Sequence, residues 1–92
     1  MKFFVISPGI AYSGYSIIEM PQARFEKGYV VKNEELLLLL EWYAEKKPDW
    51  GDPSAFVIDN SDANKETCFW IGQFYHALKR CKKTIRFTKE GE

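Results

Sequence analysis

The apolar positions of this 92-residue chain follow two different periods. Several short runs are continuously apolar or alternate between apolar and polar residues, which is typical of β-strands, whereas two longer stretches repeat every three to four residues, as an amphipathic helix does. Turn-forming pairs such as Pro8 and Gly9 separate the short runs. We therefore predict five strands, at residues 2–7, 10 or 11 to 20, 29–32, 55–59 and 84–88.

Two details of these strands follow from the same pattern. Ser13 and Gly14 predict a bulge or a tight turn inside the second strand, and residues 22–28 predict a loop or a hairpin turn before the third. In the last strand, Ile85 and Phe87 alternate with polar residues, so that they are expected to face the core while Arg86 faces outward.

The stretch from Asn64 to Lys83 carries the densest helical pattern. At 100° per residue one stripe is apolar and predicts the buried face; it contains Trp70, Phe74, Ala77 and Cys81. The opposite stripe is polar and basic apart from one aromatic ring; it contains Phe69, Gln73, His76, Arg80 and Lys83. Two interpretations stay open: Phe69 covers a neighbouring loop or strand, or the stripe is a contact surface for a protein or a nucleic acid.

A second helix is predicted to begin at Asn33 and to end before Pro48. Asn33 is a good capping residue, and two glutamates follow it in the first turn. The inward face is apolar and comprises Leu36, Leu37, Leu40, Tyr43 and Ala44. Leu38 and Trp42 lie on the flank, where we expect them to pack under the turn at residues 49–53, with Trp50 as a lid.

The element order β-β-β-α-β-α-β predicts the α+β class. We expect a single compact domain spanning residues 1–92, built as a mainly antiparallel sheet of four to five strands with two helices packed on one face. A chain of this length can bury one core without disulfides or metals.

Charge is zero overall but is unevenly distributed along the chain. Residues 1–33 hold four Lys or Arg against two Asp or Glu, residues 34–66 hold three against nine, and residues 67–92 hold six against two. A neutral chain does not have the broad positive field of a free-standing nucleic-acid binder. The basic blocks nevertheless predict contact surfaces, and their candidate residues are Arg24, Lys27, Lys32 and Asn33 in the hairpin and Arg80, Lys83 and Arg86 near the C-terminus.

No catalytic, metal or cofactor motif stands out. His76 is the one histidine, and its position on the helix is poor for pairing with Cys68 or Cys81. The DNSDAN segment at residues 59–64 has alternate oxygen ligands but not the glycine and glutamate of a calcium loop, so that a helix-capping loop explains it better. We therefore predict a protein that is not an enzyme and that binds no cofactor, metal or small-molecule substrate.

The two cysteines favour a reducing compartment. Cys68 and Cys81 lie thirteen residues apart in one predicted helix, about 20 Å along its axis, so that they cannot bridge each other. Both are expected on the apolar side as free buried thiols. The longest apolar run, Leu36 to Leu40, is far too short to cross a membrane. A cytoplasmic monomer without membrane contact is the expectation.

Over its whole length this compact, neutral chain with separated charge resembles small phage-encoded anti-CRISPR proteins that act on the type I-F surveillance complex. The resemblance implies a non-enzymatic inhibitor in the host cytoplasm. Such an inhibitor would dock on a host protein or ribonucleoprotein complex, including the guide RNA backbone, and block target DNA binding. The alternative is a small nucleic-acid-binding accessory protein that uses its basic C-terminal patch.

Overall fold

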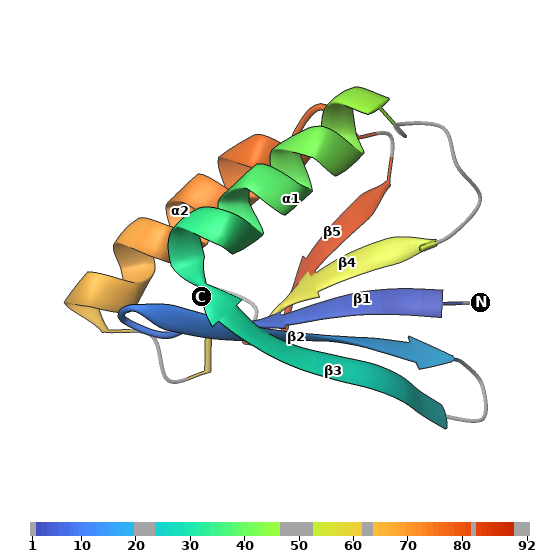
Figure 1. Ribbon diagram of the computed structural model, residues 1–92, viewed down its shortest axis with the longest axis horizontal. Coiled ribbons are helices and arrows are strands. Elements are labelled where there is room, and N and C mark those ends of the chain that lie inside the picture. The colour runs from blue at the N-terminus through green and yellow to red at the C-terminus, as the bar shows by residue number, and fades with distance from the viewer. Residues whose placement is uncertain (1, 20–23, 47–52, 62–63, 82, 90–92) are drawn as a thin grey trace.

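The computed structural model describes residues 2–19, 24–46, 53–61, 64–81 and 83–89, with residues 24–27 described by their backbone alone. The elements follow the predicted order (Figure 1). They are β1 (Lys2–Ser7), β2 (Tyr12–Glu19), β3 (Arg24–Lys32), α1 (Asn33–Lys46), β4 (Ala55–Ile58), α2 (Lys65–Leu78) and β5 (Thr84–Phe87).

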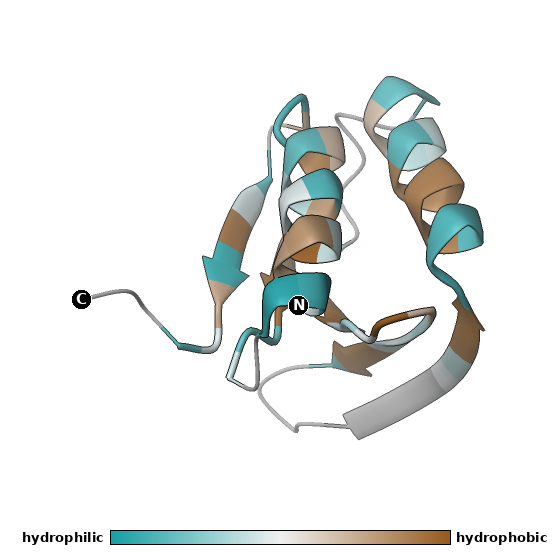
Figure 2. Ribbon diagram, turned by 90° about the vertical axis from the view of Figure 1, so that its left-hand side faces the viewer, coloured by the Kyte–Doolittle hydropathy of each residue, from teal (hydrophilic) through white to brown (hydrophobic). Residues whose placement is uncertain are grey.

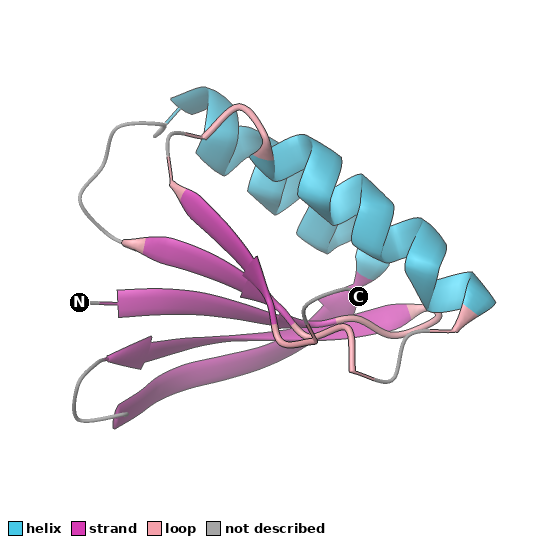
Figure 3. Ribbon diagram, turned by 180° about the vertical axis from the view of Figure 1, so that it is seen from behind, coloured by secondary structure: helices cyan, strands magenta, loops and turns pink. Residues whose placement is uncertain are grey.

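The five strands form one mixed sheet in the order β3-β2-β1-β4-β5. β1 and β2, and β2 and β3, pair antiparallel, whereas β1 and β4, and β4 and β5, pair parallel. Both helices lie on the same face of the sheet, as Figure 3 shows from behind. The prediction of an α+β fold with both helices on one face is confirmed, although half of the strand pairs are parallel because α1 and α2 each carry the chain back across the sheet before the next strand begins.

The core lies between this sheet face and the two helices. Alternate residues of β1 and β4, namely Phe4, Ile6, Phe56 and Ile58, are buried against the helices. The rings of Phe4 and Phe56 are 5.4 Å apart. Apolar and polar bands alternate along both helices in Figure 2, as expected for helices that cover one side of a sheet.

Helix α2 begins where the sequence predicted. Asn64 caps it, because its side-chain oxygen accepts a hydrogen bond from the Thr67 backbone N–H at 3.0 Å while the Thr67 hydroxyl accepts one from the Asn64 N–H at 2.8 Å. The helix ends at Leu78, five residues earlier than predicted. Cys81 is nevertheless buried in the core, whereas Cys68 is exposed, so that the prediction of two buried thiols is wrong for Cys68.

Other local predictions need correction. Residues 24–28 belong to strand β3 and not to a loop, and Ser13 and Gly14 lie in regular β2 pairing, while the register shift falls between Ile17 and Ile18. Leu38 is 66% exposed and so is not covered by other residues. The turn and the Trp50 lid that we expected above it fall in residues 47–52, outside the described part of the chain. Among the described helices, none is long and apolar enough to cross a membrane.

Candidate functional site

Both described helices start at one end of the sheet, where the turn between β1 and β2 also lies. Because β1, β4 and β5 are parallel, their carboxyl ends open onto the same edge, and β3 also ends there before α1 begins (Figure 1). Helix α2 starts at this edge too, a few residues after β4. We call this end of the sheet, where β1, β3, β4 and β5 terminate, the carboxyl edge. In open sheets with parallel strands and helical crossovers, ligands bind outside the carboxyl ends of the strands.

Asp59 is the acidic residue placed at the carboxyl edge directly after β4. Its backbone N–H donates to the Ile6 carbonyl oxygen at 2.8 Å, which sets it beside the end of β1. Its carboxylate Oδ1 accepts hydrogen bonds from the Ser61 N–H at 3.0 Å, the Ser61 hydroxyl at 2.6 Å and the Thr88 hydroxyl at 2.9 Å. These bonds, those from Ser61 first, lower the pKa of Asp59 below its usual value despite partial burial. Asp59 therefore carries a negative charge at neutral pH.

Asn60 ties the loop after β4 to the segment after β5. Its side-chain amide donates to the Lys89 carbonyl oxygen at 3.0 Å and accepts from the Lys89 N–H at 2.7 Å, and its own N–H donates to the Thr88 hydroxyl at 3.1 Å. These contacts fix the backbone around Asp59 and bring the exposed Lys89 to the same edge.

A buried polar network fixes the turn between β1 and β2. Asn33 is 0% exposed, and its Nδ2 donates to the carbonyl oxygens of Gly9 at 2.9 Å and Ile10 at 3.1 Å. The Ser13 hydroxyl, also buried, donates to Asn33 Oδ1 and accepts from the Gly9 N–H at 3.1 Å. The Asn33 N–H completes the network by donating to the Ala11 carbonyl oxygen at 3.0 Å. The turn is thus held in one conformation from the first residue of α1.

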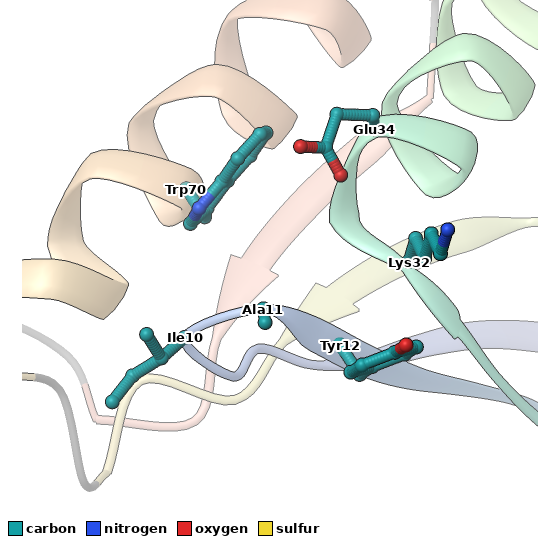
Figure 4. Close-up of a pocket in the computed structure, with 6 residues that line it drawn as sticks. All are labelled: Ile10, Ala11, Tyr12, Lys32, Glu34 and Trp70. Atoms are coloured by element: carbon teal, nitrogen blue, oxygen red, sulfur yellow. The ribbon is translucent and has the colours of Figure 1, made fainter.

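A pocket of about 310 Å³ opens between this turn and the two helices. Figure 4 shows its six lining residues around a common space, contributed by the β1–β2 turn, β2, β3 and both helices. They are Ile10, Ala11, Tyr12, Lys32, Glu34 and Trp70. Ile10 and Tyr12 are 62% and 56% exposed, which is unusual for large apolar side chains grouped on one surface.

The predicted hairpin surface is only partly observed. The side chains of Arg24 and Lys27 lie outside the described residues. Lys32 is exposed and lines the pocket. Asn33 was expected on the contact surface, and this prediction is wrong because its side chain is fully buried and bonded to the turn.

The predicted stripe is largely accessible, although Arg80 and Lys83 lie beyond the end of α2. Phe69 is 59% exposed, His76 and Arg80 are exposed, and Gln73 and Lys83 are half-buried. A groove of about 380 Å³ lies between the helices and is lined by Glu41, His76, Ala77, Lys79 and Arg80. The structure does not bring Arg86 to this stripe. Its neighbours Ile85 and Phe87 pack on the core under the helices, so that Arg86 points to the opposite face of the sheet.

Of the residues at the carboxyl edge, Lys32 was predicted from the sequence as a contact residue, whereas Asp59 and the other residues of the pocket were not. Asp59 was assigned to a capping loop, and Tyr12, Glu34 and Trp70 were assigned to a strand and two helices. The one available signal was the position of Asp59 immediately after a buried strand. Within the described residues, no three His, Cys, Asp or Glu side chains lie close enough together to hold a metal ion.

The same arrangement of strands and helices occurs in solved structures of RuvC. The chain is similar in structure to Thermus thermophilus RuvC in complex with a Holliday junction substrate, with a TM-score of 0.63 and 18% identity, and to Thermus thermophilus RuvC alone, with a TM-score of 0.60 and 18% identity. Each match covers 95% of this chain and 63% of the RuvC chain. The chain thus has the RuvC fold and spans less than two thirds of the length of RuvC. No protein-family model and no curated protein sequence matches it.

This similarity overturns the predicted function. A non-enzymatic phage inhibitor was expected, but two solved structures that share the fold are of RuvC, one of them in complex with a Holliday junction substrate. Neutral net charge and the absence of a sequence motif were insufficient grounds for that prediction, because they do not distinguish a binding protein from an enzyme.

Proposed function

We propose that this chain is a domain that binds branched DNA and takes part in cleaving its phosphodiester backbone. The observation that carries the proposal is the structural match to RuvC on its Holliday junction, which extends over 95% of this chain. The carboxyl edge is the place for the contact, because its turns are rigidly held and it presents both a carboxylate and a pocket.

Asp59 is the residue that we assign to the chemistry. A carboxylate with a lowered pKa is a good ligand for Mg²⁺, which often takes one or two protein carboxylates and completes its shell with water and substrate phosphates. When bound, such an ion neutralises developing charge on the phosphate and activates water. Among the described residues no three His, Cys, Asp or Glu side chains lie close enough together to hold an ion, so that phosphate oxygens and water would have to supply most of the other ligands.

Three lysines at the carboxyl edge are suited to hold the DNA backbone. Lys32, Lys65 and Lys89 are exposed at the end of β3, the start of α2 and the segment after β5. Lysine side chains bind phosphates as point charges and fix the position of DNA without reading its sequence. With about three phosphates neutralised, the logarithm of the binding constant should fall against the logarithm of salt concentration with a slope of roughly −3.

The test compares a fluorescently labelled four-way DNA junction with a linear duplex of equal length. Binding is followed by fluorescence anisotropy over a salt series, and cleavage with Mg²⁺ or Mn²⁺ is followed on a denaturing gel. We expect the junction to bind at least about tenfold more tightly than the duplex. Equal affinity for both DNAs would refute the branched-DNA function.

The variant Asp59→Asn separates binding from chemistry. It keeps an oxygen acceptor for Ser61 and Thr88 but removes the negative charge, so that junction affinity should not fall while cleavage falls at least about 100-fold. Glu45→Gln is the matched control, because it removes an exposed carboxylate near the C-terminal end of α1, whereas the carboxyl edge lies at the N-terminal end of this helix. Cleavage by Asp59→Asn at the wild-type rate would eliminate the assigned role.

A further inference from the structure

We infer that the pocket shown in Figure 4 binds one unstacked nucleobase, and that it prefers a base with an exocyclic amino group. This inference rests on the proposed function, because branched DNA is a source of unstacked bases. Three features of the pocket support it: aromatic walls, two charged side chains and a frame that is held in place by hydrogen bonds.

The aromatic walls match the flat faces of a base. Tyr12 stands on the strand side of the pocket and Trp70 on the helix side, and Ile10 adds an apolar surface beside them (Figure 4). More than half of the Tyr12 surface is exposed in the absence of a ligand. Aromatic rings on which bases stack are the common feature of sites for unpaired nucleic acid. The volume of about 310 Å³ is at the lower end of the range for small-molecule sites.

The two charged residues assign the orientation of the ligand. Glu34 lines the pocket with a carboxylate, which repels a phosphate group but accepts hydrogen bonds from the amino group of cytosine, adenine or guanine. Thymine has no exocyclic amino group. Lys32 lines the pocket on the same side as Glu34, and its exposed amine points away from Trp70 (Figure 4), so that it can meet the phosphate attached to the bound nucleotide.

The frame of the pocket is held before any ligand arrives. The carbonyl oxygens of Gly9, Ile10 and Ala11 are bonded to the side chain or backbone of Asn33, so that the wall formed by the turn cannot shift freely. On the helix side, the ring of Trp70 contacts the ring of Phe69, with centroids 5.3 Å apart. A site that is already ordered loses less entropy on binding than a mobile one.

The experiment measures the binding of labelled single strands of twelve deoxycytidines or twelve thymidines by fluorescence anisotropy. The wild-type chain should bind oligo-dC about fivefold more tightly than oligo-dT. Trp70→Leu should weaken both by roughly tenfold, because stacking does not depend on the base. Glu34→Gln should abolish the preference for oligo-dC, because the amide can also donate to thymine.

Two controls and one substitute variant make the result decisive. Trp42→Leu and Glu45→Gln remove the same residue types from surfaces outside the pocket and should leave both affinities unchanged. If Trp70→Leu loses its far-ultraviolet circular dichroism spectrum, Tyr12→Leu replaces it, because Tyr12 is exposed and its loss does not open the core.

The outcomes separate the two proposals. A junction preference with equal binding of oligo-dC and oligo-dT, and with pocket variants that bind as the wild type does, would overturn the base site and leave the branched-DNA function standing. The expected preference for oligo-dC without a preference for the junction would overturn the branched-DNA function and leave the base site standing. Absence of binding to every DNA would refute both.

Discussion

Replacing the buried Asn33 by alanine should strongly destabilise the fold. The side chain is fully buried and makes three hydrogen bonds, to the carbonyl oxygens of Gly9 and Ile10 and with the Ser13 hydroxyl. At about 1 kcal/mol net for each bond, the free energy of unfolding should fall by about 3 kcal/mol. This is a large part of the 5–15 kcal/mol that is typical of a small domain, and it corresponds to a loss of roughly 15 °C in Tm.

The matched control for this prediction is Asn60→Ala. The Asn60 side chain also takes part in three hydrogen bonds, with Thr88 and with both backbone groups of Lys89, but these bonds are exposed. Water can replace them, so that the loss should stay below about 1 kcal/mol. Urea unfolding followed by tryptophan fluorescence measures both variants. Equal losses would refute the argument that burial makes the Asn33 network important.

The variant Asn33→Asp adds a pH dependence to the same test. Its carboxylate would be buried against the carbonyl oxygens of Gly9 and Ile10, which raises its folded-state pKa above the value of about 3.9 in the unfolded chain. The destabilisation is then greatest above the raised pKa and shrinks as pH falls toward 4. A pH-independent loss, measured relative to the wild type, would contradict the network geometry.

Three further outcomes follow from the local chemistry. Ser61→Ala should raise the pKa of Asp59, which the chemical shift of the Asp59 carboxyl carbon measures in an NMR titration. The stabilisation from the hydrogen bonds to Asp59 is present above the ordinary pKa of an aspartate and is lost as pH falls through the lowered folded-state pKa. The variant should therefore lose less stability below about pH 4 than the wild type does. Gly9→Ala should lower the free energy of unfolding in urea by roughly 2 kcal/mol or more, because the added carbon would overlap the backbone carbonyl oxygen of Tyr12; unchanged stability would contradict this. Iodoacetamide should label the exposed Cys68 at least about tenfold faster than Cys81, since burial raises the pKa of the Cys81 thiol. Mass spectrometry of the labelled peptides measures both rates, and equal rates would contradict this prediction.

The sequence predicted the elements whose pattern is local and regular. Helix α1 has the expected first residue, and the alternation of β5 places Ile85 and Phe87 on the core side as predicted. The predicted end of α2 lies beyond the observed one because the apolar period of the sequence continues to Cys81. This residue is buried, but it belongs to the segment that follows the helix. The start of β3 was missed because polar residues and a glycine hide an edge strand.

The parallel pairing of β1 with β4 and of β4 with β5 was not predicted from local sequence patterns. Pairing of β1 with β4 depends on the crossover through α1, and the only local signal is that β4 is apolar on both faces, which is typical of a central parallel strand. The candidate site was missed for the same reason, since Asp59, Tyr12 and Trp70 meet at one edge only after the chain has crossed the sheet. Asn33 was assigned to helix capping because no sequence rule shows that its side chain reaches back to a turn more than twenty residues earlier.

The position of β1 in the middle of the sheet has a consequence for how the chain folds. The strand has one partner close by in the sequence, β2, and one about fifty residues away, β4. The meander of β1, β2 and β3 can therefore form early from short loops, while closure of the parallel half must await the ordering of α1 and costs the entropy of a long loop. Completion of the carboxyl edge, where β1 and β4 end together, is thereby coupled to the slowest step of folding, so that a partly folded chain would have neither Asp59 nor the pocket in place.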